Sequence, residues 1–482
     1  MVSQKTYAVI LFVLLCSAFS SVCLGLQQID ISINSWGTIG TPSSVHGYIC
    51  GNYNSTHYYA QNNITGNYEL ISTNAAQTIS YALSKLTPGR TWQEAIILKG
   101  SFSIYSTVTV SGSNTLLDFS QATVNIFAVV PAFDIRGSSN TFYGGLYNPF
   151  TGQGTHSVWN GQGTTSSAIW AWGTKDTVDG FEFTGFRNSQ VLAAADGGTT
   201  VREMTIQNCY FHDNPGATNI LLNNERSGYN SVLGCKFGIS FSGIVVAGGV
   251  IQNVVDGCEF YGWHSSGGHA IYFGGGNAAN SGYNTVSNNY FHDGVNGAGC
   301  HIKCHYNSIH DNVFENMTLS TAVPFSIYSE MPGYLANDND IYNNSITNCY
   351  YGFFIGHDTS GNNPTLRNLI HDNHFTKVTN CFRILATSNT VEDTKIYYND
   401  FTNCPTVFQT TGATASWIKN TVIAYNYIDN ASVPNVSWVQ SWANSMSYQN
   451  TRSATDTSLA MPNFNYNAVT DPASWYYVAP RA

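Results

Sequence analysis

The stretch Asn307-Ser308-Ile309-His310-Asp311-Asn312-Val313-Phe314 carries the pattern that decides the fold. Its last three residues follow a signature, a Cys or Asn, then any residue, then a Phe or Ile. The nine copies of this signature are Cys209-Tyr210-Phe211, Cys235-Lys236-Phe237, Cys258-Glu259-Phe260, Asn289-Tyr290-Phe291, Asn312-Val313-Phe314, Asn344-Ser345-Ile346, Asn373-His374-Phe375, Asn399-Asp400-Phe401 and Asn426-Tyr427-Ile428. Self-similarity of this kind is typical of a repeat architecture, so we expect each copy to mark one coil of a solenoid.

The spacing of the copies indicates β-coils. The Phe or Ile advances by 23 to 32 residues per copy, and the 217 residues from Phe211 to Ile428 make eight steps with a mean of about 27. Helical repeats keep nearly fixed lengths, whereas β-coils take up extra residues in loops. Segments such as Asn253-Val254-Val255 and Asn284-Thr285-Val286 are β-branched and bounded by Gly and Asn, which favours strands.

The first signature position predicts a ladder inside the solenoid. Equivalent residues of stacked coils lie about 4.8 Å apart, so the Asn amides can satisfy one another from coil to coil while they are buried. Three Cys precede the Asn and should stack as buried thiols, namely Cys209, Cys235 and Cys258. Cys349 and Cys404, each in a Thr-Asn-Cys sequence, are candidates for a second ladder.

The signature and its flanking strands resemble the right-handed parallel β-helix superfamily, the pectin-lyase-like fold. Strands such as Gly352-Phe353-Phe354-Ile355 contribute to the likeness, and the segments Ala75 to Leu83 and Ala95 to Ile104 are similar to the family's opening, a short capping helix followed by the first rungs. The resemblance covers residues 72–430. It implies an all-β chain, a single-stranded right-handed parallel β-helix with a short N-terminal capping helix and an irregular C-terminal cap.

The ends of the chain predict export. Lys5, the apolar run Ala8 to Leu15 and the small residues before Gly25 are typical of a secretory signal peptide. The alternatives are a lipoprotein anchored through Cys23 and an uncleaved anchor helix. We expect a secreted or cell-surface protein, and not a multi-pass membrane protein, because no later run reaches the roughly 20 apolar residues of a span.

Four parts follow from these features. They are the signal peptide at 1–25, an N-terminal extension with the capping helix at 26–95, the parallel β-helix at 96–430 and a C-terminal cap or tail at 431–482. We expect the tail to cover the last coil, which would otherwise expose unpaired backbone groups.

The charge balance excludes one class of partner. The chain has 18 Lys and Arg against 28 Asp and Glu, a net charge of −10, and only 10% charged residues. Nucleic-acid binding requires a basic stripe that neutralises phosphates. We therefore expect a polysaccharide or other glycan partner, and no nucleic acid.

The histidines mark the best candidate site, because six of the thirteen fall between His264 and His310. In the run from Gly299 to His305, strand alternation places Cys300, Ile302 and Cys304 inward and His301, Lys303 and His305 outward on an exposed face. Neighbouring coils would add further polar side chains to this face, namely His269, Tyr272, Ser326, Tyr328, Glu330 and Arg383. The resemblance implies that such a groove performs glycan chemistry.

The residue types favour β-elimination or epimerisation on a uronic-acid polymer. A base must take the proton next to the carboxylate, a cation must neutralise the carboxylate, and an acid must serve the leaving oxygen. Lys303, flanked by two histidines, is the candidate base and Arg383 the carboxylate-binding group. Tyr328 or His269 is the candidate acid. Lyases of this superfamily commonly use Lys or Arg, so the resemblance supports these residue types.

A glycoside hydrolase is an alternative. It needs two carboxylates about 5 to 9.5 Å apart. Glu330 with Asp338 or Asp340 would supply them from one long loop. A third function class is non-catalytic, a surface adhesin, glycan-binding or envelope protein that uses a Tyr- and Trp-rich exterior as a sugar platform.

Two metal sites are conceivable from the sequence. Asp338 and Asp340 offer the hard oxygen ligands that calcium takes. For zinc, His301 and His305 lie about 13 Å apart on an extended strand, so only a pair from neighbouring coils, such as His269 with His301, could share one ion.

Four His-Asp pairs recur beside the signature. They are His212-Asp213, His292-Asp293, His310-Asp311 and His371-Asp372. Their recurrence indicates turn chemistry, with Asp at the corner and His on the surface. The pair at 292–293 is the candidate exception, because it lies beside the histidine-rich run.

Overall fold

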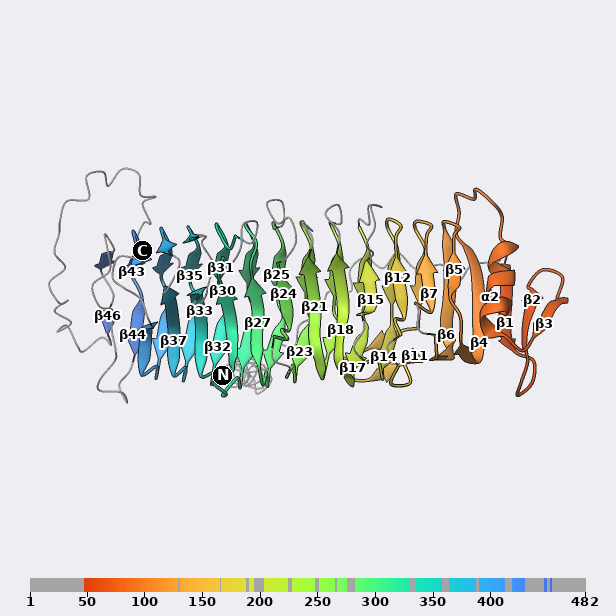
Figure 1. Cartoon of the computed structure of the whole chain (residues 1–482), viewed down its shortest axis with the longest axis horizontal. Helices are drawn as coiled ribbons and strands as arrows, with labels where there is room; N and C mark the ends of the chain where they lie inside the picture. Colours follow the sequence, from red (N-terminus) through yellow and green to blue (C-terminus); the bar gives the residue numbers. More distant parts are fainter. Residues whose placement is uncertain are drawn as a thin grey trace, which may run out of the picture. The chain divides into compact units, whose positions relative to one another are not determined.

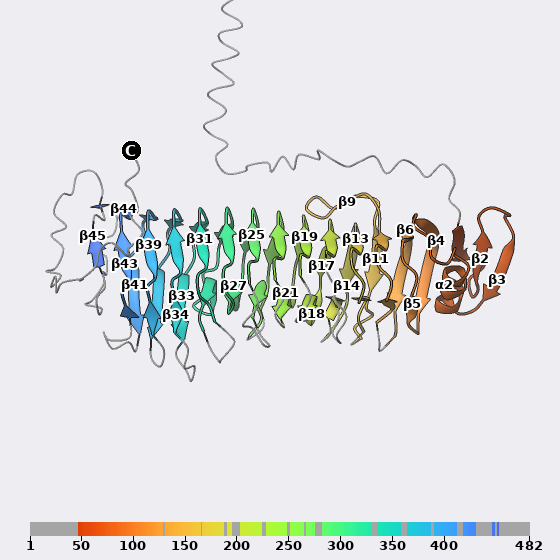
Figure 2. The same cartoon turned by 90° about the horizontal axis from the view of Figure 1, so that it is seen from above.

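The computed structural model describes residues 47–128, 131–164, 166–187, 190–194, 203–223, 228–247, 251–264, 267–274, 282–329, 335–357, 364–386, 390–411, 418–429, 446–448 and 451–452. This part of the chain is nearly all strand, and successive coils stack in parallel along one axis (Figures 1 and 2). The predicted parallel β-helix is confirmed. The signal-peptide prediction falls on residues outside the described part.

A cap closes the N-terminal end of the helix. It consists of three antiparallel strands and one helix, which lead into two long strands, namely β1 (Gly47–Asn52), β2 (Tyr58–Asn62), β3 (Tyr68–Ser72), α2 (Ala75–Ser84), β4 (Glu94–Ile104) and β6 (Thr115–Ile126). The side chain of Asn74 accepts a hydrogen bond of 3.1 Å from the Gln77 amide and so caps α2. Ala75, Ile79 and Ala82 are buried against the core. The predicted capping helix is confirmed, and it covers backbone that an open coil would expose.

Each coil contributes one strand to each of three faces. The first face is a twelve-stranded parallel sheet of β5 (Val108–Val110), β7 (Phe133–Ile135), β12 (Ile169–Ala171), β15 (Gln190–Ala194), β18 (Asn214–Asn223), β21 (Ser240–Ala247), β24 (Ile271–Phe273), β27 (Gly297–Ile302), β30 (Ala322–Ile327), β33 (Tyr351–His357), β37 (Asn380–Ala386) and β41 (Thr406–Thr411).

The second and third faces are parallel ladders that meet at β6, which pairs with the first strand of each. The second face holds β8 (Thr141–Tyr143), β13 (Thr177–Asp179), β16 (Thr205–Gln207), β19 (Ser231–Leu233), β22 (Val254–Asp256), β25 (Thr285–Ser287), β28 (Ser308–His310), β31 (Asp340–Tyr342), β35 (Leu369–His371), β39 (Lys395–Tyr397), β43 (Val422–Ala424) and β45 (Met446–Tyr448). The third face holds β11 (Ser157–Asn160), β14 (Phe181–Thr184), β17 (Tyr210–His212), β20 (Lys236–Phe237), β23 (Glu259–Tyr261), β26 (Tyr290–His292), β29 (Val313–Glu315), β32 (Ser345–Thr347), β36 (His374–Thr376), β40 (Asp400–Thr402), β44 (Tyr427–Asp429) and β46 (Thr451–Arg452). Outside the faces lie a small hairpin, β9 (Tyr147–Asn148) with β10 (Gln153–Gly154), and a short sheet of β34 (Thr365–Leu366), β38 (Val391–Glu392) and β42 (Ile418–Lys419).

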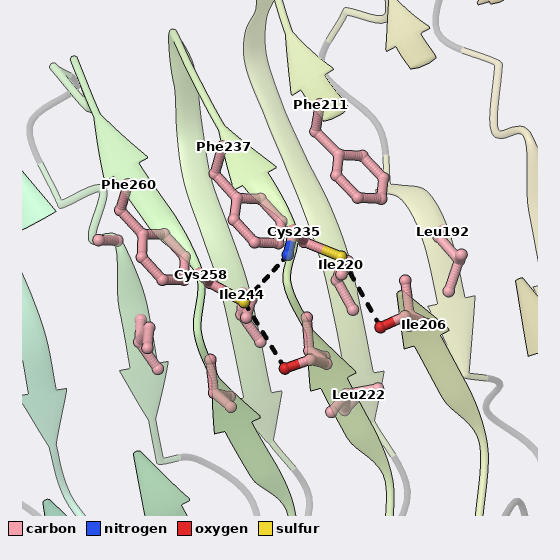
Figure 3. Packing of buried hydrophobic residues seen from close by; sticks show 14 of the residues in the cluster. Leu192, Ile206, Phe211, Ile220, Leu222, Cys235, Phe237, Ile244, Cys258 and Phe260 are labelled. Atoms are coloured by element: carbon pink, nitrogen blue, oxygen red, sulfur yellow. Dashed lines mark hydrogen bonds between the residues drawn. The ribbon is translucent and has the colours of Figure 1, made fainter. Parts of the chain in front are cut away.

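Stacked aromatic rings fill the interior behind the third face. Phe211, Phe237 and Phe260 occupy equivalent register positions, and their rings point into the helix side by side (Figure 3). The rings of Phe237 and Phe260 are nearly parallel, with centroids 4.6 Å apart. Burying a side chain of this size stabilises the fold by about 1.5 to 3 kcal/mol. The apolar member of the signature is therefore the core of each coil.

The predicted Asn ladder is confirmed at the corner between the second and third faces. Asn344 donates from Nδ2 to Asn373 Oδ1 at 2.9 Å and to the Ile309 carbonyl at 3.0 Å. The same Nδ2–Oδ1 bonds, at 2.9 to 3.0 Å, join Asn289, Asn312, Asn344, Asn373, Asn399 and Asn426 in order. All six side chains are buried, and the bonds satisfy amides that would otherwise be costly there.

The cysteines continue this ladder toward the N-terminus. The Cys235 amide lies 3.4 Å from Cys258 Sγ (Figure 3). The Cys258 amide in turn donates to Asn289 Oδ1 at 2.8 Å. Cys209, Cys235 and Cys258 are buried thiols outside any disulfide, as predicted. The candidate second Cys ladder is wrong, because the strand register places Val378 between Cys349 and Cys404.

A second Asn ladder occupies the corner between the first and second faces, and the sequence analysis missed it. Nδ2–Oδ1 bonds of 2.7 to 2.9 Å join Asn230, Asn253, Asn284, Asn307, Asn339 and Asn368. The signal was present, because these Asn residues precede β-branched strands in coil after coil. Asn339 thus belongs to the core and not to an acidic loop.

Strand pairing extends beyond residue 430, the predicted end of the β-helix. β45 pairs with β43 and β46 pairs with β44, both in parallel. The other tail residues lie outside the described part, so the predicted C-terminal cap remains a prediction. Among the helices of the described residues, none is long and apolar enough to cross a membrane.

Candidate functional site

The histidine-rich strand β27 lies in the middle of the first face. The register places His301 between Tyr272 of β24 and Ser326 of β30. Cys300 and Ile302 point into the core, as strand alternation predicts. The prediction of an exposed outward face is wrong, because His301 and Lys303 are only 5% and 7% exposed. Aromatic side chains from the neighbouring coils cover them.

A groove of about 260 Å³ runs over the outer surface of the first face. Four of the predicted catalytic residues line it, namely His269, His301, Tyr328 and Arg383. The wall between them is polar at Ser326 and apolar at Val323, Phe354 and Leu385. The groove therefore joins residues that are more than a hundred positions apart in the sequence.

Lys303 is not among the residues that line the groove, but it lies beside Tyr328, which is. Its Nζ is 4.8 Å from the ring centroid of Tyr328 and 5.5 Å from that of Tyr272. An ammonium group at this distance from two aromatic faces is held by their quadrupoles. These contacts fix the lysine side chain next to a phenol that faces the groove.

His269 lies in the wall of the groove and has a lowered pKa. Its Nδ1 accepts a hydrogen bond of 2.9 Å from the backbone amide of Ala298. Its ring centroid lies 4.1 Å from that of His301 and 5.5 Å from that of Tyr272. Burial, with a smaller contribution from the charge of Lys303, lowers the pKa of His269 to about 3. The imidazole is therefore uncharged at neutral pH.

Gly297 makes the contact between His269 and Ala298 sterically feasible. Its φ is +78°, and a Cβ at this position would lie 1.8 Å from the carbonyl oxygen of Gly268. Only glycine allows this approach, so the residue at the start of β27 determines where the Ala298 amide points.

Arg383 lies at the other end of the groove. Its Nη1 donates to the Tyr351 hydroxyl at 3.2 Å, and its guanidinium packs 5.3 Å from the ring centroid of Phe354. The register runs from His301 through Ser326 and Phe354 to Arg383, which is three rungs, or about 14 Å along the axis. The arginine is thus separate from the cluster around Lys303.

The remaining predicted catalytic residues are not brought to the groove. His305 is half-buried beyond the end of β27, with its ring 5.8 Å from that of Tyr306. Burial lowers the pKa of His305, while Asp338 opposes the shift. Glu330 falls on residues outside the described part.

The two predicted calcium ligands face different partners. Arg367 donates from Nε and Nη2 to the Asp338 carboxylate, both at 2.6 Å, and His371 Nε2 lies 2.9 Å from Asp340 Oδ1. Buried Asn339 separates the two. The described residues contain no group of three or more His, Cys, Asp and Glu side chains that could hold a metal ion. The calcium site and the His269–His301 zinc pair thus remain predictions.

The four His-Asp pairs share one turn geometry. In each, His Nδ1 lies 2.6 to 2.8 Å from the Asp Oδ2 of the next residue. Each Asp has a φ between 50° and 58°, a left-handed conformation that Asp tolerates. His292, the candidate exception, lies on the third face and not at the groove. The prediction of turn chemistry therefore extends to it as well.

A network of ionisable groups on the third face was not foreseen. Glu182 lies 2.9 Å from His156 Nε2 and 3.1 Å from His212 Nε2. Further along, Glu259 lies 3.1 Å from Lys236 Nζ and 3.3 Å from His292 Nε2. These groups come from different coils, so only the register brings them together.

Comparisons with known proteins support the architecture. A family model described as "NosD: Periplasmic copper-binding protein (NosD)" matches residues 327–433, less than a quarter of the chain. The catalytic domain of a GH87 alpha-1,3-glucanase in complex with tetrasaccharides is similar in structure, with a TM-score of 0.50, 13% identity and coverage of 77% of this chain and 67% of that one. The chain has the right-handed parallel β-helix fold.

Other solved β-helices are similar at lower scores. A mannuronic acid specific polysaccharide family 6 lyase from human gut microbiota gives a TM-score of 0.49 at 13% identity, covering 75% of this chain and 80% of that one. The Azotobacter vinelandii mannuronan C-5 epimerase AlgE6 A-module gives 0.45 at 10% identity, covering 80% and 96%. No curated protein matches the chain. At these identities the likeness concerns the fold alone.

Proposed function

We propose that the protein is an exported carbohydrate-active β-helix, and that the groove on its first face is the active site of a polysaccharide lyase or related epimerase acting on a uronic-acid-containing glycan. The observation that carries this proposal is the convergence of His269, His301 and Tyr328 in one groove, with Lys303 held beside Tyr328. An amine and a phenol are groups that can transfer the protons in a reaction next to a carboxylate. The glucanase of the same fold, which binds tetrasaccharides, supports a glycan as the ligand class.

Both reactions begin with the same step. A base takes the proton from the ring carbon next to the carboxylate, and the negative charge that develops on the carboxylate must be stabilised. We assign Lys303, acting as the uncharged amine, as the base that becomes an ammonium in this step. Tyr328, whose ring Lys303 contacts, then protonates the leaving oxygen in a lyase or returns a proton to the opposite side of the carbon in an epimerase.

The role expected for Arg383 changes with its position. Three rungs, or about 14 Å, separate its strand position from that of His301, a spacing that suits contact with a different sugar unit from the one whose proton Lys303 takes. We assign Arg383 to the carboxylate of another sugar unit of the same chain. The substrate is therefore a polymer or oligomer that lies along the groove, parallel to the helix axis.

A panel of soluble glycans in deuterated buffer tests the proposal. A lyase gives unsaturated products that absorb in the ultraviolet, and an epimerase incorporates solvent deuterium at the carbon next to the carboxylate. We expect one of these signals with a uronic-acid polymer and neither with a neutral glycan. New reducing ends without unsaturation would instead indicate the hydrolase that pairs Glu330 with Asp338 or Asp340.

A non-catalytic glycan-binding role is the second candidate, and a specific feature favours it. On the second face the rings of His310, Tyr342, His371 and Tyr397 stack in one column, with neighbouring centroids 4.8 to 5.2 Å apart. Because the stacked rings cover one another's faces, the row presents ring edges and Tyr hydroxyls, with which a sugar chain can form hydrogen bonds. Glycan binding without any turnover, lost on substitution of Tyr342 and retained on substitution of Lys303, would establish this role in place of the first.

A further inference from the structure

We propose that His269 serves the reaction as an uncharged hydrogen-bond donor whose Nε2–H binds the carboxylate of the reacting sugar unit, and that it neither gives nor takes a proton. This inference rests on the proposed function and replaces the expected role of His269 as an acid. Its basis is the hydrogen bond between His269 and Ala298, together with the position of the ring in the groove wall.

The backbone of β27 fixes the tautomer of His269. A backbone amide can only donate, so the 2.9 Å contact with Ala298 requires a lone pair on Nδ1. In a neutral imidazole the other nitrogen then carries the hydrogen, so Nε2 is a donor. Protonation of Nδ1 would break the bond to Ala298 and leave two donors facing each other. The geometry thus opposes both the imidazolium form and the alternative tautomer.

The surroundings of His269 keep it uncharged. The rings of His301 of β27 and Tyr272 of β24 contact it, and burial, with a smaller contribution from the charge of Lys303, lowers its pKa to about 3. A group of this kind is a poor acid at neutral pH because it holds no removable second proton. It is also a poor base because its only lone pair is occupied by Ala298.

An uncharged donor suits the place where charge develops. His269 lines the groove together with Tyr328, and Lys303 contacts the ring of Tyr328. When Lys303 takes the proton from carbon, the electron pair moves into the carboxylate, and a fixed N–H donor stabilises this oxygen more than it stabilises the ground state. The proton goes to Lys303, the leaving oxygen receives one from Tyr328, and His269 ends the cycle with the proton it began with.

Nitrogen-15 NMR of the full chain labelled only at histidine tests the tautomer without need of activity. His269→Gln identifies the signal. We expect Nε2 to carry the hydrogen, with no titration of the ring between pH 8 and pH 5. A hydrogen on Nδ1, or an imidazolium that forms in this range, would overturn the inference.

Kinetics test the role toward substrate. Removing one preorganised donor typically costs about 10²- to 10³-fold in kcat, so we expect a loss of this size for His269→Ala. His269→Gln keeps an amide N–H near the position of Nε2 and should retain activity within about tenfold, with an unchanged pH profile. Equal losses in both variants would indicate proton transfer by His269. This result would overturn the inference about His269 but not the proposed function.

Two controls show whether a loss of activity comes from the missing donor of His269 or from loss of the fold. His374→Ala, at a side chain 55% exposed on the third face, should leave turnover unchanged. Thermal unfolding of each variant shows whether a loss of activity reflects loss of fold. If the wild-type protein turns over no uronic-acid glycan, the proposed function falls, and the substrate role of His269 falls with it, whereas the NMR result still decides the tautomer.

Discussion

At the scale of single residues, the corner ladders decide where polar groups can be buried. The second column also holds a carboxyl group, because the register places Asp176 next to Asn140, at the position where Asn230 to Asn368 stand in later coils. Its Oδ1 accepts a hydrogen bond of 2.8 Å from the Asn140 amide, and it is 1% exposed. Burial raises the pKa of Asp176 from 3.8 to about 7. A protonated carboxyl group there has the shape and hydrogen-bonding pattern of an amide.

Replacing Asp176 by Asn should therefore stabilise the protein in a pH-dependent way. The raised pKa means that the stabilisation from the neutral carboxyl is complete below about pH 4 and is lost as pH rises toward 7. Asp176→Asn should raise the free energy of unfolding by on the order of 2–4 kcal/mol at pH 7.5 and by little at pH 4. Chemical denaturation at the two pH values measures this. Asn253→Asp, in the same column, should show the opposite pH dependence, and equal effects of Asp176→Asn at both pH values would contradict the account.

Asn344 tests the first ladder. Its Nδ2 donates to the Ile309 carbonyl, and its Oδ1 accepts from the backbone amide and the Nδ2 of Asn312, so Asn344→Leu would remove these bonds from buried groups. We expect a loss of about 1 to 3 kcal/mol for each group left unsatisfied. Ser345→Ala, at the outward neighbour on β32, should change stability by less than about 0.5 kcal/mol. Thermal unfolding of Asn344→Leu at the wild-type temperature would show that the ladder is dispensable.

At the scale of elements, the repeat signature predicts strands well because the core of each coil is local in sequence. Phe211 to Ile428 were identified from their own signature. The coils before them, which the resemblance included, lack the signature because Ser157 and Phe181 occupy the ladder position there, although Trp159 and Phe183 align with the Phe column. The polar network of the third face could not be predicted, since its partners are set by register between coils of different length.

The candidate site was predicted only in part for the same reason. Strand alternation within Gly299 to His305 gave the correct inward residues, but it contains no information on what covers the outward ones. Tyr272 and Tyr328 come from neighbouring strands and bury Lys303, whereas His305 lies beyond the end of the strand. The distance between Arg383 and His301 likewise depends on the number of coils between them.

The third-face network predicts a link between stability and pH. Burial lowers the pKa of His212, but hydrogen bonds and charge from Glu182 and Asp213 outweigh it, so the pKa is raised. The stabilisation from His212 is complete below its unfolded-state pKa, which is near 6.5, and is lost as pH rises through its raised folded-state pKa. Glu182→Gln should therefore reduce stability more at pH 5.5 than at pH 9, by about 1 kcal/mol or less since the pair is partly exposed. Denaturation curves with equal losses at both pH values would contradict this.

At the scale of the whole molecule, the β-helix protects its sulfur. Cys209, Cys235 and Cys258 are buried, and burial raises the pKa of the Cys209 and Cys235 thiols well above the usual value. Thiol reagents act on the thiolate, so these cysteines should not react until the helix unfolds. Labelling followed by mass spectrometry, before and after denaturation, checks this. Rapid native labelling of any of the three would contradict the fold.

The proposed function requires that the groove of the first face is a site of proton abstraction. Substitution of Lys303, the assigned base, is the direct test of this requirement. Because Lys303 is buried, the measurement compares Lys303→Met, which keeps the side-chain bulk, with Lys303→Arg, which keeps the charge. We measure the rate of unsaturated product formation or deuterium incorporation on the best uronic-acid substrate, with unfolding curves as a check on the fold. The account predicts a loss of about 10²- to 10⁴-fold in both variants, because a guanidinium cannot act as a base at neutral pH. Wild-type turnover in folded Lys303→Met would contradict it.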